Sequence, residues 1–471
     1  LFQLTRVLYL SPLRRYPGPI FARYTPFWLA TQCRNTRRSA AVMEQHNRHG
    51  DFVRIGPNHI SINTPEAVAE IYGHKSGCVK SDFYDVFLQV TPVVFNVTDP
   101  ASHQRKRKYM NPAFSARALA DFESSMDEEV LGWKQRLIEM AKNKEHKIDF
   151  AVWTNYLAFD VIGRFAFGSS FGFVENSNDH YNLISTINTR GEVLNALGSL
   201  PAYIRPWMKY NYFDPFWSAG LRATANLGAI GKRAYQKRKN DAEPQKDLLS
   251  YLFKAEDINE QEIIAESISF IVGGSDTTSS TITNVIDFVS RDAKLQQKLQ
   301  KELDEAFPGE QFVDWVASDK IVQSLPLLNA TLREVMRVRP TSATGLERVV
   351  PIGGKTIAGE YFPAGTIVSV PTCGLMSDER VFKNPTEFRP ERWLEADSKD
   401  LVEYFLPFST GPRACIGRNF AWMEVLKALA VLFKLLDVRR ATHEPTLIRE
   451  GFFNKATECM CFVTLRSSSG K

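Results

Sequence analysis

Apolar residues recur at helical spacing along most of the chain. Residues 418–436 place Val425, Leu429 and Leu432 three or four positions apart, which is the spacing of one face of a helix. Residues 121–254 follow a similar pattern, and helical segments continue into the 340s. These segments predict a protein built mainly of α-helices.

Two stretches instead alternate between apolar and other residues, as half-buried strands do. Residues 51–62 carry Val53 and Ile55 before a Gly-Pro-Asn turn and Ile60 after it, which predicts a hairpin that is followed by a helix. Residues 341–371 predict further short strands with glycine-containing turns. The expected fold class is therefore α+β, mainly α with a smaller β part.

Residues 261–290 are long, apolar at both ends and free of Lys and Arg, so a membrane-spanning helix has to be considered. Gly273, Gly274 and Asp276 stand in its middle, and a charged residue at that depth costs at least about 2.5 kcal/mol. We therefore expect a buried helix of a large domain. Each glycine costs such a helix roughly 1 kcal/mol relative to Ala, which indicates that the space they leave is needed.

The composition favours one large folded unit. The chain has 471 residues, of which 44% are hydrophobic and 24% charged, and no repeat or Gly/Ser-rich linker divides it. We expect a single domain at residues 21–471. Residues 1–20 are expected to be the remnant of a membrane anchor and a proline-rich hinge, because the apolar start is too short to span a bilayer. A soluble protein with a proline-rich N-terminal arm is the alternative.

Cysteine usage and charge exclude some classes of protein. The six cysteines follow no disulfide framework, which favours a reducing compartment. A formal net charge of +5 is too small to indicate a nucleic-acid partner. Basic runs at residues 105–108 and 232–239 are either solvated helix faces or docking sites for an acidic protein or anionic lipid.

The strongest chemical signal is the segment FLPFSTGPRACIG at residues 405–417. Gly411 and Gly417 bracket Cys415 in a tight loop just before a helix, where free N–H groups stabilise a thiolate. Arg413 supplies a cation and Phe408 an apolar wall. This setting suits an iron in a planar anionic macrocycle, with the sulfur as ligand and Arg413 beside a propionate. A structural buried cysteine is the alternative.

The motif F-x-x-G-x-R-x-C-x-G formed by these residues resembles the haem-binding signature of the cytochrome P-450 (haem-thiolate) monooxygenases. The resemblance covers almost the whole chain. It implies a triangular helical prism around a buried haem b, with Cys415 as the axial ligand of the iron and Phe408, Gly411, Arg413 and Gly417 around it.

The segment G-G-x-D-T-T at residues 273–278 resembles the oxygen-binding motif of that family, in which the helix bulges and leaves a groove for O2. Cleavage of bound dioxygen requires protons, and the resemblance gives their delivery to Asp276 and Thr277 as catalytic residues. Hydroxyl groups that bond back to helix carbonyls are the alternative reading of this cluster.

Other motifs fall in the family's order. Glu334 and Arg337, in a Glu-x-x-Arg helix, together with Arg392 resemble its buried structural triad. His103 and Arg107 lie four residues apart on a helix. By resemblance they hold a haem propionate, as does Arg348. The pocket residues that the resemblance implies or that suit a small acid are Phe83, Tyr84, Phe87, Phe95, Gly274, Ser342, Thr344, Phe452 and Phe453.

The resemblance predicts a monooxygenase that uses O2 and electrons from a separate NADPH-cytochrome reductase, because the chain shows no flavin or nicotinamide module. Segments such as KSDFYDVF and FPAGTIVSVP are similar to fungal benzoate para-hydroxylases, which favours a benzoate-like aromatic acid with Ser342 or Thr344 near its carboxylate. Arg339-Pro340 and Glu347 depart from them and leave terpenoid or polycyclic xenobiotic substrates open.

A haem-thiolate isomerase or dehydratase and a haem sensor are the other classes considered, and the Asp276-Thr277 pair counts against both. By resemblance we expect a monomer associated with the endoplasmic reticulum membrane on its cytosolic face, with no nucleic-acid partner.

Overall fold

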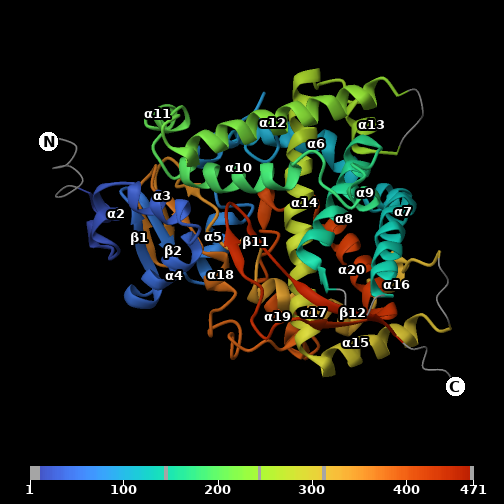
Figure 1. Cartoon of the computed structure of the whole chain (residues 1–471). Helices are drawn as coiled ribbons and strands as arrows, with labels where there is room; N and C mark the ends of the chain where they lie inside the picture. The colour runs from blue at the N-terminus through green and yellow to red at the C-terminus, as the bar shows by residue number, and fades with distance from the viewer. Residues whose placement is uncertain (1–10, 143–146, 242–245, 310–313, 467–471) are drawn as a thin grey trace.

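The computed structural model describes residues 11–142, 147–241, 246–309 and 314–466 (Figure 1). Long helices surround a central one, the sheet that contains β1 and β2 lies at the left of the view, and β12 crosses its lower right, so the expected α+β class is confirmed. The first half of the expected anchor remnant, residues 1–10, lies outside the described residues. In the part of the chain that is described, no helix is both long and apolar enough to cross a membrane.

The central helix is α14 (Glu260–Arg291), which the sequence predicts within one residue at each end. Its start is fixed by a capping box, in which the Asn259 side chain accepts from the N–H of Glu262 and the Glu262 carboxylate accepts from the N–H of Asn259. α14 packs along α8 (Phe150–Phe167) and also touches the cysteine-side helix α20 (Arg418–Leu435). Apolar side chains from all three helices pack into one core.

The remaining helices enclose this core or link it to the sheets. The longer ones are α4 (Arg38–His49), α6 (Pro100–Met110), α7 (Ala116–Ala141), α10 (Leu183–Gly198), α12 (Pro215–Lys239), α15 (Ala293–Ala306) and α17 (Pro326–Val338). The short ones are η2 (Pro12–Arg15), α2 (Ile20–Tyr24), α3 (Phe27–Arg34), α5 (Glu66–Tyr72), η3 (Asp82–Phe87), η4 (Asn111–Phe114), α9 (Phe173–Asn176), α11 (Arg205–Lys209), α13 (Leu248–Leu252), α16 (Asp319–Val322), α18 (Thr372–Leu375), η5 (Pro390–Trp393), α19 (Ser398–Val402) and η6 (Gly411–Arg413).

The largest sheet has the order β1-β2-β8-β5-β3. Its first two strands form the predicted hairpin, and the only parallel pair within this sheet joins β2 to β8. A second sheet has the order β4-β12-β9, and two hairpins, β6-β7 and β10-β11, stand apart. The strands are β1 (Phe52–Gly56), β2 (His59–Ile62), β3 (Val79–Lys80), β4 (Lys147–Asp149), β5 (Arg348–Val349), β6 (Lys355–Ile357), β7 (Glu360–Phe362), β8 (Ile367–Ser369), β9 (Leu436–Arg440), β10 (Ile448–Glu450), β11 (Asn454–Ala456) and β12 (Met460–Leu465).

Candidate active site

The loop before α20 holds Cys415 in place. The Cys415 N–H donates to the carbonyl of Phe408 over 2.9 Å. Gly411 has a φ of +70°, and a Cβ there would lie 1.9 Å from the Tyr72 carbonyl oxygen, so only glycine fits. Gly417 is the N-cap residue of α20 and has an ordinary φ of −84°, so it does not adopt the positive φ for which a glycine was expected here.

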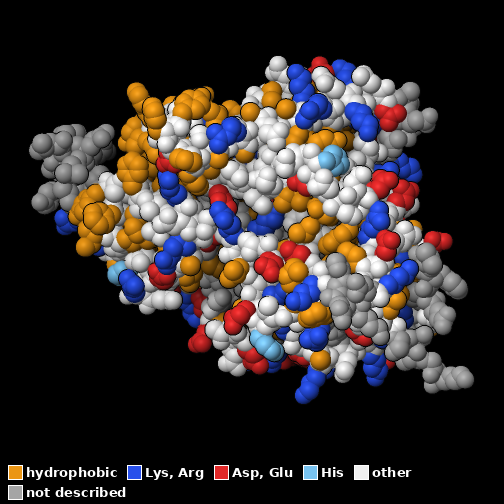
Figure 2. Space-filling view, in the orientation of Figure 1, with side chains coloured by type: hydrophobic (Ala, Val, Ile, Leu, Met, Phe, Trp, Pro, Cys, Tyr) orange, Lys and Arg blue, Asp and Glu red, His pale blue; other side chains and the backbone are white. Residues whose placement is uncertain are grey.

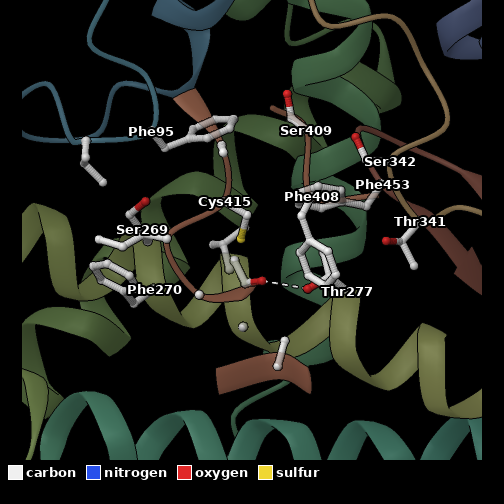
Figure 3. Close-up of a pocket in the computed structure, with 18 of the residues that line it drawn as sticks. Phe95, Ser269, Phe270, Thr277, Thr341, Ser342, Phe408, Ser409, Cys415 and Phe453 are labelled. Carbon is white, nitrogen blue, oxygen red and sulfur yellow. Dashed lines mark hydrogen bonds between the residues drawn. The ribbon is translucent and has the colours of Figure 1, made fainter. Parts of the chain in front are cut away.

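A cavity of about 290 Å³ opens beside this loop, and residues of α14 form another part of its wall. Cys415 is enclosed by protein, yet its side chain is exposed to the interior of the cavity. Figure 3 shows Cys415, Phe408 and Thr277 around the same space. The loop and the helix that carry the two strongest sequence motifs therefore meet at one cavity.

Burial raises the pKa of the Cys415 thiol. The N–H of Gly417 and the guanidinium groups of Arg107 and Arg418 oppose that effect. A metal ion bound to the sulfur would remove the thiol proton outright. The N–H group and the two guanidinium groups therefore offset part of the cost of burying a thiolate, and a metal ion bound to the sulfur would offset the rest.

The two glycines of α14 have different roles. A Cβ at Gly273 would meet nothing within 4 Å, so this residue leaves open space over the helix. A Cβ at Gly274 would lie 2.5 Å from Cδ1 of Ile162, so this glycine allows α8 to pack closely. The Thr277 hydroxyl donates to the Gly273 carbonyl over 2.8 Å (Figure 3). α14 runs through this region as a continuous helix rather than with the bulge that the resemblance implied.

Asp276 points away from the cavity of Cys415. Its carboxylate accepts a hydrogen bond from Lys455 over 2.7 Å, and the same ammonium group donates to Asn188. Asp276 lines a second cavity of about 280 Å³ instead. The two expected proton-relay residues thus lie on different faces of α14, with Thr277 toward Cys415 and Asp276 toward the second cavity.

Basic side chains gather on the cavity wall near Cys415. Arg107, Arg348 and Arg413 all line the cavity, as expected, together with His103 and with Lys80, which the sequence analysis did not identify. Arg413 donates to the carbonyls of Val97 and Thr98, and Arg107 and Arg348 donate to backbone carbonyls as well. None of these basic groups forms an ion pair with a carboxylate among the described residues.

This uncompensated charge shifts the pKa values of the cluster. Burial, together with Arg413 and the other cations, lowers the pKa of His103 to about 3. Burial and the neighbouring Arg348 lower the pKa of Arg413 to about 10, and the same causes lower that of Lys80. A buried group of cations without acids fits a ligand that brings carboxylates. The two propionates of haem b meet that need, and Cys415 supplies an axial sulfur ligand.

Aromatic rings line a further part of the cavity wall and adjoin the basic cluster, because the Lys80 ammonium lies 4.1 Å from the centre of the Tyr84 ring and 4.5 Å from that of Phe95. Tyr84, Phe87, Phe95, Phe452 and Phe453 all contribute to the wall, as does Ser342. The Phe87 and Phe452 ring centroids are 4.8 Å apart, and those of Phe87 and Phe95 are 5.5 Å apart. Two expected pocket residues lie elsewhere. Phe83 packs behind Phe87 and Phe452 in the core, and Thr344 is buried behind the wall.

The Glu-x-x-Arg helix and the segment at η5 form one buried ion network. Glu334 accepts two hydrogen bonds from Arg337, at 2.8 and 2.9 Å, and one from Arg392 at 2.9 Å. The indole N–H of Trp393 and the backbone N–H of Arg389 donate to the same carboxylate. Burial alone would raise the pKa of Glu334, but these partners outweigh it and lower the pKa. The structure thus brings together the three residues of the expected triad.

A cysteine sulfur that faces a cavity, a basic wall for carboxylates and a hydroxyl-bearing helix across the space define a haem-thiolate protein. The chain belongs to the cytochrome P-450 family, whose model matches residues 17–459. It is a monooxygenase, and the family uses haem as cofactor and O2 as co-substrate.

Three enzymes similar to this chain come from fungi. A benzoate 4-monooxygenase from Aspergillus niger is 35% identical over 97% of this chain and 93% of its own length. A cytochrome P-450 monooxygenase from Penicillium roqueforti is 33% identical over 91% of this chain and 89% of its own. A pisatin demethylase from Fusarium vanettenii is 29% identical over 97% and 89%.

Proposed function

We propose that this monooxygenase hydroxylates a small aromatic acid of the benzoate type, with electrons from a separate NADPH-cytochrome reductase. The observation that carries the proposal is the single cavity that joins the Cys415 sulfur and the Thr277 hydroxyl to a wall of phenylalanine rings. The likeness to a benzoate 4-monooxygenase over nearly the full length supports the substrate class. In the overall reaction one atom of O2 is inserted into a C–H bond of the substrate, and the other is reduced to water by two electrons from NADPH and two protons.

The chain's own residues have separate tasks in this proposal. Haem b, when bound through Cys415, supplies the activation of O2. Arg107, Arg348 and Arg413 would hold its carboxylates, and the phenylalanine rings would exclude water. The Thr277 hydroxyl would donate its proton into the cavity after turning away from the Gly273 carbonyl, and Gly273 leaves the space for it open. Asp276 lies behind the wall, and release from Lys455 would free it to resupply that proton.

A membrane-bound setting fits the outer surface near α2 and α11. Phe21, Trp207 and Phe213 are 72%, 82% and 99% exposed. Figure 2 shows apolar side chains gathered over this end of the molecule. Exposed apolar area of this kind suits contact with a lipid surface. We therefore propose association with the cytosolic face of the endoplasmic reticulum membrane.

The reductase is proposed to dock on the cysteine side of the molecule. Arg418, which directly follows the cysteine loop, is exposed there. The basic run at residues 105–108 is less available than its sequence suggests, because Arg105 and Lys106 are both paired with Glu262. The docking surface would therefore depend on single exposed cations near α20 more than on that run.

The test is turnover by the haem-loaded full chain with a purified NADPH-cytochrome reductase. We expect oxygenated product from benzoate, formed in proportion to NADPH consumed, and none from the Cys415→Ser variant. Neutral terpenoids form the second panel, since Arg339-Pro340 and Glu347 leave that class open. Product from terpenoids alone would refute the aromatic-acid assignment. Isomerised or dehydrated product without O2 consumption would refute the monooxygenase reaction.

A further inference from the structure

One buried cation on the cavity wall belongs to none of the groups described above. Arg190 lies in α10, is 5% exposed, and lines both the cavity of Cys415 and the second cavity behind it. It shares this position with Phe87, Phe452 and Phe453. The sequence held a signal for it, because Arg190 interrupts the apolar face that Leu183, Ile187, Leu194 and Leu197 form along the helix.

The Arg190 guanidinium is poorly satisfied. It donates one hydrogen bond, to the Phe87 carbonyl at 3.3 Å, and its Nε has no hydrogen-bond partner among the described residues. No carboxylate of the described chain lies within ion-pair distance, and burial alone lowers its pKa to about 10. A guanidinium carries five N–H donors, so most of its capacity is unused. A buried charge without a partner is costly, which indicates that a ligand completes the site.

The haem carboxylates do not account for Arg190. The cations that act electrostatically on His103 are Arg413, Arg107, Lys80 and Arg348, which form one cluster. No charge of that cluster, nor any other neighbouring charge, contributes to the pKa of Arg190. The cluster already supplies more positive charge than two propionates neutralise. Arg190 is therefore left for a second anion.

The surroundings of Arg190 favour an aromatic anion. Its guanidinium carbon is 5.9 Å from the centre of the Phe87 ring. Phe87, Phe95 and Phe452 contact each other edge to face, with centroids 4.8 to 5.6 Å apart. A planar ring fits against such surfaces, and a carboxylate matches the planar fork of arginine with two parallel hydrogen bonds.

We propose that Arg190 binds the carboxylate of an aromatic acid substrate and thereby determines acid specificity. This inference rests on the proposed function. The carboxylate is held at the α10 wall, and the opposite end of the ring is left free to face Thr277 and Cys415. For a benzoate that end is the para carbon. Arg190, rather than Ser342 or Thr344, is then the main determinant of acid binding.

The test compares an acid with its neutral ester on the haem-loaded protein. Benzoate and methyl benzoate are titrated, and the shift of the haem absorption band gives each Kd. For Arg190→Gln we expect benzoate to bind at least about 30-fold more weakly, as for loss of one partner of a buried ion pair. Methyl benzoate should stay within about 3-fold, because it has no charge to lose. Arg222→Gln, a neutralised exposed arginine on α12, is the matched control and should change neither Kd.

Arg190→Lys keeps the charge without the planar fork and guards against a folding defect in Arg190→Gln. It should retain a preference for the acid over the ester, at a smaller ratio than the wild type. Equal weakening of acid and ester in Arg190→Gln would overturn the proposal, since it would show a purely structural role. Unchanged benzoate binding in that variant would overturn it as well.

The role of Arg190 and the proposed monooxygenase function can be refuted by different results. A wild-type enzyme that oxygenates neutral terpenoids and binds no carboxylate would overturn the role of Arg190 while the monooxygenase reaction stands. Benzoate binding that requires Arg190, in an enzyme that oxygenates nothing with reductase and NADPH, would overturn the proposed function while the carboxylate site stands.

Discussion

Glu334→Gln is the sharpest test of what holds the cysteine side of the fold together. Glu334 is fully buried and accepts side-chain hydrogen bonds from Arg337, Arg392 and Trp393. The amide keeps the shape but removes the charge, which leaves two buried guanidinium groups without a counterion. Breaking a buried ion pair in this way costs about 3–5 kcal/mol. We expect a loss of unfolding free energy in that range and a lower haem content.

The assay is denaturant unfolding of the haem-loaded protein, followed by tryptophan fluorescence and by haem absorption. Glu395→Gln is the matched control, because Glu395 pairs with Arg389 in the same segment but is 45% exposed on its side chain. An exposed pair of this kind contributes about 1 kcal/mol or less. If Glu334→Gln unfolds within about 1 kcal/mol of the wild type with normal haem content, the triad has no folding role.

Three further predictions concern α14 and the cysteine loop. Thr277→Ala should keep NADPH consumption and divert it to hydrogen peroxide, measured as product formed per NADPH; unchanged coupling would remove Thr277 from proton delivery. Gly411→Ala should cost at least about 2 kcal/mol and reduce haem retention, because of its positive φ and the Tyr72 carbonyl, whereas Gly417→Ala has room and should not. Burial raises the pKa of Glu266 to about 7, although the Lys106 ammonium lies 3.3 Å from its carboxyl group. The protonated carboxyl therefore stabilises the fold at low pH, and this contribution is lost as the pH rises from the ordinary pKa of a glutamic acid to about 7. Glu266→Gln should remove about 3 kcal/mol of that pH dependence, seen in thermal unfolding from pH 4.5 to 8; an unchanged profile would contradict the assignment.

The sequence predicts those parts of the fold and site that depend on local pattern. The bounds of α14 follow from a long segment that is apolar at both ends and free of Lys and Arg, and the β1-β2 hairpin follows from alternation around a turn. The cysteine loop is recognisable because five spaced residues specify it. The sequence also identifies the buried triad of Glu334, Arg337 and Arg392. The spacing of Glu334 and Arg337 alone would describe an ordinary surface ion pair, but the order of these residues relative to the other motifs favours the triad.

The sequence does not predict the direction in which individual side chains point, nor which charged residues of apolar segments lie buried without a partner. Asp276 and Thr277 are neighbours in sequence, yet one helix turns them about 100° apart, so they face different cavities. Phe83 and Phe87 lie on one short 3-10 helix, but only Phe87 reaches the cavity wall. Lys80 opens the segment KSDFYDVF, which indicates no role for its charge, and Arg190 belongs to no motif. Only the packing of distant segments reveals that their charges lie uncompensated inside the protein.

The β10-β11 hairpin has a mechanical consequence. Its turn carries Phe452 and Phe453 into the cavity wall, and the next strand carries Lys455 to Asp276. A substrate large enough to displace Phe452 and Phe453 would therefore also move the hairpin strand that carries Lys455, and with it the ion pair between Lys455 and Asp276. Residues 452–455 thus couple the size of the substrate to release of the Asp276 carboxylate. A substrate that does not displace the rings would leave Asp276 paired with Lys455.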